Sequence, residues 1–205
     1  MTHFFVITVP LLGLFLLFVT WYGGKGKPLR PDEIEAFFNA LGKMDLSEGE
    51  KEIIPEIRSL LANDDGQEFV MQNLVRHRPR ALYPAGYHYN DDARAADQRY
   101  GKAIILPLLR QGSLPIFIAR RSGSFIEPEG ADLWHYVAMV RYRSRRDFLR
   151  FVLAIQTRDI AVHKWAALEK THVFPVKPLV SLLLVRSSVA GLLMIIAAGL
   201  LLLMR

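Results

Sequence analysis

Long apolar runs lie at the two ends of the chain, and shorter periodic patterns lie between them. Residues 4–22 are apolar or aromatic except for Pro10, Gly13 and two threonines, and residues 189–204 carry no charge. At 1.5 Å per residue, about 19 helical residues approach the roughly 30 Å hydrocarbon core of a bilayer. Both runs therefore predict transmembrane helices, and a weaker apolar run at residues 179–185 extends the second one.

The first run has a second interpretation, a cleaved signal peptide. Such a peptide needs a basic amino-terminal region and small residues at its cleavage site. Met1-Thr2-His3 supplies no lysine or arginine, and the run ends in Trp21 and Tyr22. Aromatic residues of this kind are typical of a membrane interface, so the pattern favours a retained helix.

Small residues open the second run, directly after Arg186. Ser187 and Gly191 have the four-residue spacing that lets another helix approach closely, the alternative being plain contact with lipid. Arg186 is expected to extend its guanidinium toward the interface.

Basic residues flank the inner ends of both runs: Lys25, Lys27 and Arg30 after the first, and Lys170, Lys177 and Arg186 before the second. The outer flanks offer only the amino terminus and Arg205. The positive-inside rule therefore predicts a cytoplasmic middle and two outer termini. This is the topology of a two-pass protein of the inner (cytoplasmic) membrane.

The middle of the chain is organised around a strand, a short turn and a helix. Residues 133–142 are rich in aromatic and β-branched side chains and contain no glycine or proline, which predicts a strand. Ser144 suits a helix N-cap, and Asp147 suits the first turn, where a carboxylate complements the helix dipole. Apolar residues then recur at helical spacing through Ile155.

Two short amphipathic helices are expected before this unit. Pro31 opens one, and the capping-box spacing of Ser47 and Glu50 opens the other, which Pro55 interrupts. Their polar faces are acidic, so we expect them to pack on the domain and not on an anionic membrane surface.

The other predicted elements are a strand at 68–77, a helix capped by Asp91 or Asp92 that runs past Ile104, a strand at 114–120, a helix at 159–169 and an edge strand at 171–176. The order after residue 67 is β-α-β-β-α-helix-β, the ferredoxin-like split βαβ arrangement of the α+β class. An antiparallel sheet with its helices on one face leaves the other face uncovered. Pairing two such faces predicts a homodimer.

Domain boundaries follow from these patterns. We expect a transmembrane helix in residues 1–24, a ferredoxin-like α+β domain in 31–178 with a helical extension at 31–62, and a second transmembrane helix in 179–205.

Composition excludes several classes of protein. The chain has no cysteine, so disulfides and thiolate metal sites are excluded. The formal net charge is +6, but the basic residues are spread out and no nucleic-acid-binding motif accompanies them. The expected partners are the lipid bilayer, a second copy of the chain and a membrane partner, with no nucleic acid and no cofactor.

Short motifs mark residues 33–175. They are Asn73-Leu74-Val75-Arg76-His77-Arg78, Tyr100-Gly101, Gln111-Gly112, Trp134, Arg141-Tyr142-Arg143-Ser144-Arg145-Arg146-Asp147-Phe148 and His163-Lys164-Trp165-Ala166-Ala167-Leu168. In this order and spacing they resemble a widespread uncharacterised family of ferredoxin-like proteins in the dimeric α/β-barrel superfamily. The resemblance implies a fold and a dimer but no activity. His77, where an aromatic is more usual, and Ser113, in place of a second glycine, depart from the pattern.

Candidate site residues follow from the expected barrel, in which the sheet face away from the helices would line a cavity. The catalytic candidates are His135, His77 and Arg141, since histidine acts as a base near neutral pH and arginine holds an oxyanion. The ligand-binding candidates are Asn73, Tyr100 and Tyr142. Each also has a structural interpretation, as a backbone tie, a core residue or a solvated strand end.

Metal chemistry has little support in the sequence. His163 and His172 are nine residues apart, which is not the spacing of metal ligands on one helical face. Asp91, Asp92 and Asp97 are interpreted as a cap and a solvated helix face. Arg141, Arg143, Arg145 and Arg146 are interpreted as a solvated strand end and helix start, or as an anion or lipid-headgroup site near the membrane.

These patterns leave the enzymatic status open and support three hypotheses. The first is a binding domain that dimerises and engages a membrane partner or a small apolar ligand. The second is a cofactor-independent oxygenase or isomerase that acts on a quinone-like or lipid-like substrate. The third, weaker one is a haem-handling protein that uses a histidine.

Overall fold

The computed structural model describes residues 2–24, 26–44, 46, 48–157, 159–179 and 185–203. Contacts within the chain divide it into two compact units. One unit joins the two ends, Met1–Gly24 and Pro178–Arg205, and the other is Lys25–Lys177.

The unit built from the chain ends contains helices α1 (Thr2–Gly23) and α8 (Val185–Leu203). Both are long and apolar enough to cross a membrane, as predicted. They contact each other, and the Arg186 guanidinium lies 4.7 Å from the ring centroid of the buried Tyr22. A Cβ atom added at Gly191 would meet no atom within 4 Å, so the small-residue spacing at Ser187 and Gly191 does not mark this helix contact.

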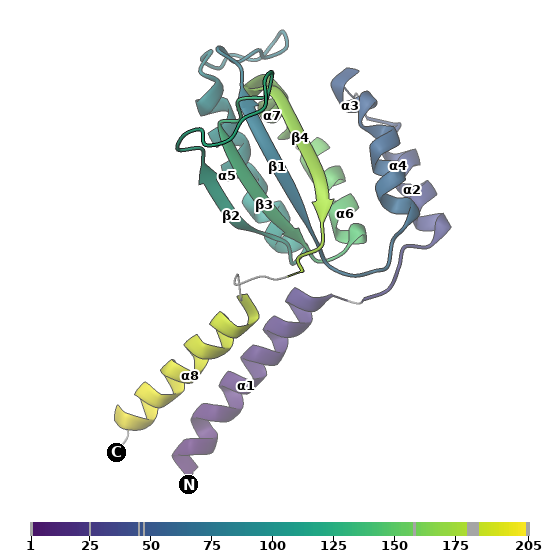
Figure 1. The fold of residues 1–205 in the computed structure, drawn as a ribbon. Helices are drawn as coiled ribbons and strands as arrows, with labels where there is room; N and C mark the ends of the chain where they lie inside the picture. The colour runs from purple at the N-terminus through teal and green to yellow at the C-terminus, as the bar shows by residue number, and fades with distance from the viewer. Residues whose placement is uncertain are drawn as a thin grey trace. The chain divides into compact units, whose positions relative to one another are not determined.

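The second unit is a mixed α+β domain around a four-stranded antiparallel sheet, which confirms the predicted class. Its strands are β1 (Phe69–His77), β2 (Leu114–Arg120), β3 (Tyr136–Tyr142) and β4 (Leu168–Val176). Their order across the sheet is β2-β3-β1-β4, with β1 and β3 in the centre (Figure 1). The register places Met71 opposite Val140 and Val75 opposite Tyr136.

Three helices cover one face of this sheet: α5 (Ala93–Arg110), α6 (Arg145–Gln156) and α7 (Ala161–Ala167) (Figure 1). Alternate strand residues point to this face. Phe69 and Met71 of β1 and Val140 and Tyr142 of β3 form one buried cluster with Ile104, Leu108, Phe151 and Ile155 of the helices. This cluster is the core of the domain.

A helical layer formed by α2 (Pro31–Leu41), α3 (Glu48–Glu52) and α4 (Ile54–Ala62) packs on the outer side of α6. The buried contact joins Phe37, Leu41, Ile57 and Leu61 to Leu149 of α6. These helices therefore pack on the domain, as expected. Ser47, half of the predicted capping box, lies outside the described residues, and Pro55 sits in the first turn of α4.

The carboxy-terminal part of the domain differs from the predicted boundaries. The helix expected to reach residue 169 ends at Ala167, and the last strand begins at Leu168. Leu168 and Lys170 pair with His77 and Arg76 of β1, so tertiary pairing overrides the local helical pattern. Strand β3 also begins later than expected, at Tyr136.

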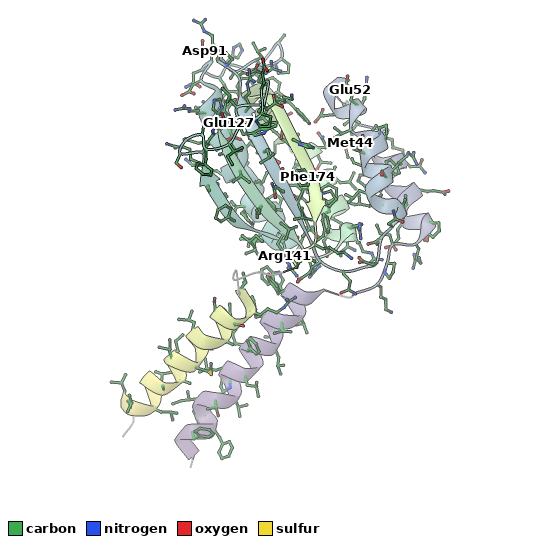
Figure 2. The ribbon with its side chains drawn as sticks, in the orientation of Figure 1. Met44, Glu52, Asp91, Glu127, Arg141 and Phe174 are labelled. Atoms are coloured by element: carbon green, nitrogen blue, oxygen red, sulfur yellow. The ribbon has the colours of Figure 1, made fainter. Side chains whose placement is uncertain are left out.

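The other face of the sheet carries apolar residues that belong to none of the buried clusters in the described part of the chain. They include Leu74, Phe117, Val137, Met139 and Phe174, the last of which is labelled on β4 in Figure 2. Phe117 is 42% exposed. No helix of residues 26–44, 46, 48–157 or 159–177 supplies a buried partner for this face, which we call the open face.

Candidate functional site

A cavity of about 960 Å³ lies between helix α5 and the helix-covered face of the sheet. Strands β1, β2 and β3 form one wall and α5 forms the other, with contributions from α7 and β4. Many of the lining side chains are apolar, among them Val75, Ile104, Ile118, Ala138 and Val140. The lining also contains many polar and charged side chains, so the site combines apolar walls with groups that can hydrogen-bond to a small molecule.

The cavity is on the covered face, so the expectation that the candidates line the uncovered face is wrong for Asn73, His77 and Tyr100. Asn73 and His77 alternate in step with the buried Phe69 and Val75, which face the helices. Tyr100 reaches the same cavity from α5. The alternation of side chains along β1 was enough to place Asn73 and His77 on the covered face from the sequence alone.

A polar cluster joins His77, Asp97 and Tyr136 at the cavity wall. The Nε2 atom of His77 lies 3.0 Å from Oδ2 of Asp97, and the Tyr136 hydroxyl donates to Oδ1 of Asp97 at 3.1 Å. Asp97 is only 17% exposed, so its interpretation as part of a solvated helix face is wrong. Burial raises the pKa of Tyr136, and the Asp97 carboxylate raises it further, so the phenol stays protonated and donates.

His135 stacks on this cluster. Its ring lies 5.3 Å from that of His77, with 20° between the two planes, and its Nδ1 accepts from the His77 backbone N–H at 2.9 Å. Partial burial lowers the pKa of His135, and the neighbouring His77 and Arg94 lower it further. A neutral imidazole is consistent with the acceptor role of Nδ1.

Asn73, Tyr100 and Tyr142 also line the cavity. The Asn73 amide donates to the carbonyl oxygens of Met71 and Ala138 at 3.0 and 3.3 Å, so it ties down the backbone. The hydroxyls of Tyr100 and Tyr142 form no hydrogen bond with any residue the structure describes. Burial raises the pKa of both phenols, which therefore remain available as donors.

Lys164 of α7 is a lining residue that the sequence did not single out as chemical. Within the described ranges it forms no hydrogen bond or ion pair. Its Nζ lies 5.2 Å from the ring centroid of Trp165 and 6.0 Å from that of Tyr100. Burial lowers the pKa of Lys164, an effect that the charges of Asp97 and Glu50 oppose.

Three arginines line the cavity, one from the start of α5 and two from the end of β2 and the β2–β3 loop. They are Arg94, Arg120 and Arg121. Arg121 is fixed to its own loop, because its guanidinium donates to the Gly123 carbonyl at 3.1 Å and pairs with Glu127. Arg94 and Arg120 pair with no carboxylate among the described residues.

Arg141, the expected oxyanion partner, does not reach the histidines. Its side chain is 4% exposed, donates to the Gly112 carbonyl at 2.8 Å and pairs with Glu68. It lies toward one end of the sheet, away from the loop that carries Glu127 (Figure 2). Arg141 is therefore a structural residue and does not line the cavity.

The next three arginines along the chain were interpreted as solvated, but each pairs with a carboxylate. Arg143 pairs with the buried Asp147 at 2.7 Å, Arg145 with Asp64 at 3.1 Å, and Arg146 with Glu33 at 2.8 Å. The Arg145 and Arg146 pairs fix the start of α6 to the turn at residues 63–66 and to α2. Across the described residues, no group of three or more histidine, aspartate or glutamate side chains is placed to hold a metal ion.

Comparison with known proteins identifies structural relatives only. No protein-family model and no curated protein matches the chain. Two crystal structures of the RPA0582 protein match with a TM-score of 0.54. The methylated form is 28% identical, over 67% of this chain and 95% of that one. The other, described as a protein of unknown function from Rhodopseudomonas palustris, is 27% identical, over 67% of this chain and 98% of that one.

Proposed function

We propose that this chain is a two-pass inner-membrane protein whose cytoplasmic ferredoxin-like domain binds a small, largely apolar molecule. The observation that carries the proposal is the cavity of about 960 Å³ between α5 and the sheet, whose wall is apolar over much of its area and also carries polar side chains. A volume of this size accommodates a compact organic molecule.

The proposed fold family is the dimeric α/β-barrel superfamily. In its support, the described strands and helices alternate as β-α-β-β-α-helix-β, and the sheet order β2-β3-β1-β4 is that of a split βαβ arrangement. The proposed orientation rests on the basic residues that follow α1 and precede α8 in the sequence.

The proposed dimer would bury the open face of the sheet. Met139 lies in a central strand, opposite Gln72 on one side and Phe117 on the other. An apolar sheet face without cover is a common site of self-association.

Replacing Met139 with lysine is therefore expected to convert the dimer to a monomer, because a charge would have to be buried between two sheets. The mass of the detergent-solubilised protein, measured by light scattering, should fall by half. Phe125→Lys is the matched control, since Phe125 is 98% exposed on the β2–β3 loop. A wild-type protein with the mass of one chain would contradict the dimer.

Gly101 offers a direct test of ligand binding. It lines the cavity from α5, and a Cβ added there meets no atom within 4 Å. Gly101→Phe should place a ring in the part of the cavity next to α5 without a backbone clash and weaken binding of a neutral aromatic ligand, 2-naphthamide, by at least about tenfold. Calorimetric titration of the full chain in phosphatidylcholine nanodiscs, with empty nanodiscs as the blank, measures this.

Gly101→Ala is the control for the helix itself. It should retain binding and raise the free energy of unfolding by up to about 1 kcal/mol, because alanine has the higher helix propensity. Binding that is the same in wild type, Gly101→Ala and Gly101→Phe would place the ligand elsewhere and contradict the proposal.

The alternative function, a cofactor-independent oxygenase or isomerase, is favoured by one observation, the contact between His77 and Asp97 at the cavity wall. Such a pair can move a proton on a bound substrate. The placement of Arg141 outside the cavity removes the oxyanion partner expected for that chemistry. Binding is therefore the function that the geometry supports best.

A further inference from the structure

We propose that the ligand of this cavity is an apolar acid, and that Lys164 holds its anionic oxygen with the hydroxyls of Tyr100 and Tyr142 as additional donors. This inference rests on the proposed binding function and specifies the class of ligand.

The first support is the environment of Lys164. Its side chain is half-buried and lines the cavity, yet within the described part of the chain it has no hydrogen-bonding or ion-pair partner. A cation that is partly withdrawn from water and has no directly bonded counter-charge is costly. An anion bound in the cavity would supply that counter-charge.

The second support is that the cavity's own carboxylate is already engaged. Asp97 is the only acidic residue among those described as lining the cavity. Its two oxygens contact His77 and Tyr136 at 3.0 and 3.1 Å. Glu50, the other carboxylate near Lys164, accepts from Gln156 at 2.7 Å and from Trp165 at 3.1 Å. Neither carboxylate lies within ion-pair distance of the ammonium.

The third support is the balance of charge around the cavity. Its described lining contains four basic side chains, Arg94, Arg120, Arg121 and Lys164, and one carboxylate, that of Asp97. Arg121 is neutralised by Glu127 of its own loop, which leaves three basic side chains against one carboxylate. Excess positive charge in a cleft with apolar walls draws anions toward it. The apolar walls then favour an acid with a hydrocarbon body.

The experiment compares two ligands of the same shape, 2-naphthoate and its neutral amide 2-naphthamide, by calorimetry on the full chain in zwitterionic nanodiscs. The wild-type protein should bind the acid at least about tenfold more tightly, the scale of a charge-assisted hydrogen bond. Lys164→Met should abolish this preference while it changes the affinity for the amide by less than about threefold. Lys164→Arg, which keeps the charge, should retain the preference.

Lys102→Met is the matched control, because Lys102 is exposed on α5 and does not line the cavity; it should leave both affinities unchanged. Equal affinity of the wild type for the two ligands would overturn the acid assignment and leave the binding function in place. A Lys164→Met variant that is folded and still prefers the acid would also overturn it. Binding of neither ligand would overturn the binding function as well.

Discussion

Replacing Asp147 with asparagine is expected to lower the free energy of unfolding by about 3 kcal/mol, because the change breaks a buried ion pair. The Asp147 side chain is 5% exposed. Its carboxylate accepts from Nε and Nη2 of Arg143 at 2.7 and 2.9 Å and from the Ser144 hydroxyl at 2.8 Å. An amide cannot accept all three bonds and carries no charge. Urea unfolding followed by tryptophan fluorescence measures the loss.

Acid should reproduce part of this effect in the wild-type protein. Burial acts to raise the pKa of Asp147, but the hydrogen bonds from Arg143 and Ser144 outweigh it and hold the pKa below its usual value of 3.8. A carboxyl with a depressed folded-state pKa stabilises the fold above its unfolded pKa. That contribution is lost as the pH falls below about 4, and Asp147→Asn should lack this part of the pH dependence.

Arg150→Gln is the matched control for Asp147. Arg150 pairs with the same carboxylate at 3.3 Å, but its side chain is 57% exposed. Exposed pairs contribute about 0–1 kcal/mol, so this variant should stay close to wild type. If Asp147→Asn and Arg150→Gln lowered the free energy of unfolding equally, burial would not set the strength of the Asp147 contacts.

Gly66→Ala is expected to lower the free energy of unfolding by about 3 kcal/mol, because the added Cβ strains the backbone and collides with a neighbouring segment. Gly66 has φ of +71°, and a Cβ atom there would lie 2.5 Å from the carbonyl carbon of Lys27 and 2.7 Å from the nitrogen of Pro28. The two segments cannot separate freely, because the Asp64 carboxylate accepts from the N–H groups of Leu29 and Gly66 at 2.6 and 3.0 Å. Thermal or urea unfolding measures the change.

Gly86→Ala is the matched control, because it introduces the backbone strain without the steric collision. Gly86 also has positive φ, +95°, but a Cβ there meets no atom within 4 Å. The Gly86→Ala variant should therefore lose only the free energy of unfolding that corresponds to the conformational strain, about 1 kcal/mol. If Gly86→Ala proved as harmful as Gly66→Ala, the close approach of residues 26–28 to the turn would be wrong.

Local sequence patterns were sufficient to predict most of the helices and strands. The alternation in β1 and β3, the Ser144 cap and the two apolar runs each depend on a few neighbouring residues. The Ser144 hydroxyl does accept from the Asp147 backbone N–H, at 3.2 Å, as predicted. The boundary between α7 and β4 could not be predicted in this way, because pairing with β1 sets it.

The site was predicted less completely, since it depends on contacts between distant segments. His77, His135, Asn73, Tyr100 and Tyr142 do line one cavity. Arg141 does not, because the Gly112 carbonyl and Glu68 engage it at another part of the sheet.

The sequence analysis did not predict several of the cavity residues, among them Asp97 and Lys164. Asp97 lies four residues after Ala93 and three before Tyr100, so helical spacing placed it on the buried face of α5 and was the available signal. No local pattern marks Lys164, whose significance comes from its lack of a partner within the described chain.

The most direct test of the proposed function is native mass spectrometry of the full chain released from its membrane, compared between wild type, Gly101→Ala and Gly101→Phe. A small-molecule adduct should accompany each wild-type and Gly101→Ala chain and be lost or strongly reduced in Gly101→Phe, whose added ring takes up the part of the cavity next to α5. A bare wild-type chain, or the same adduct on all three proteins, would contradict binding in the cavity between α5 and the sheet.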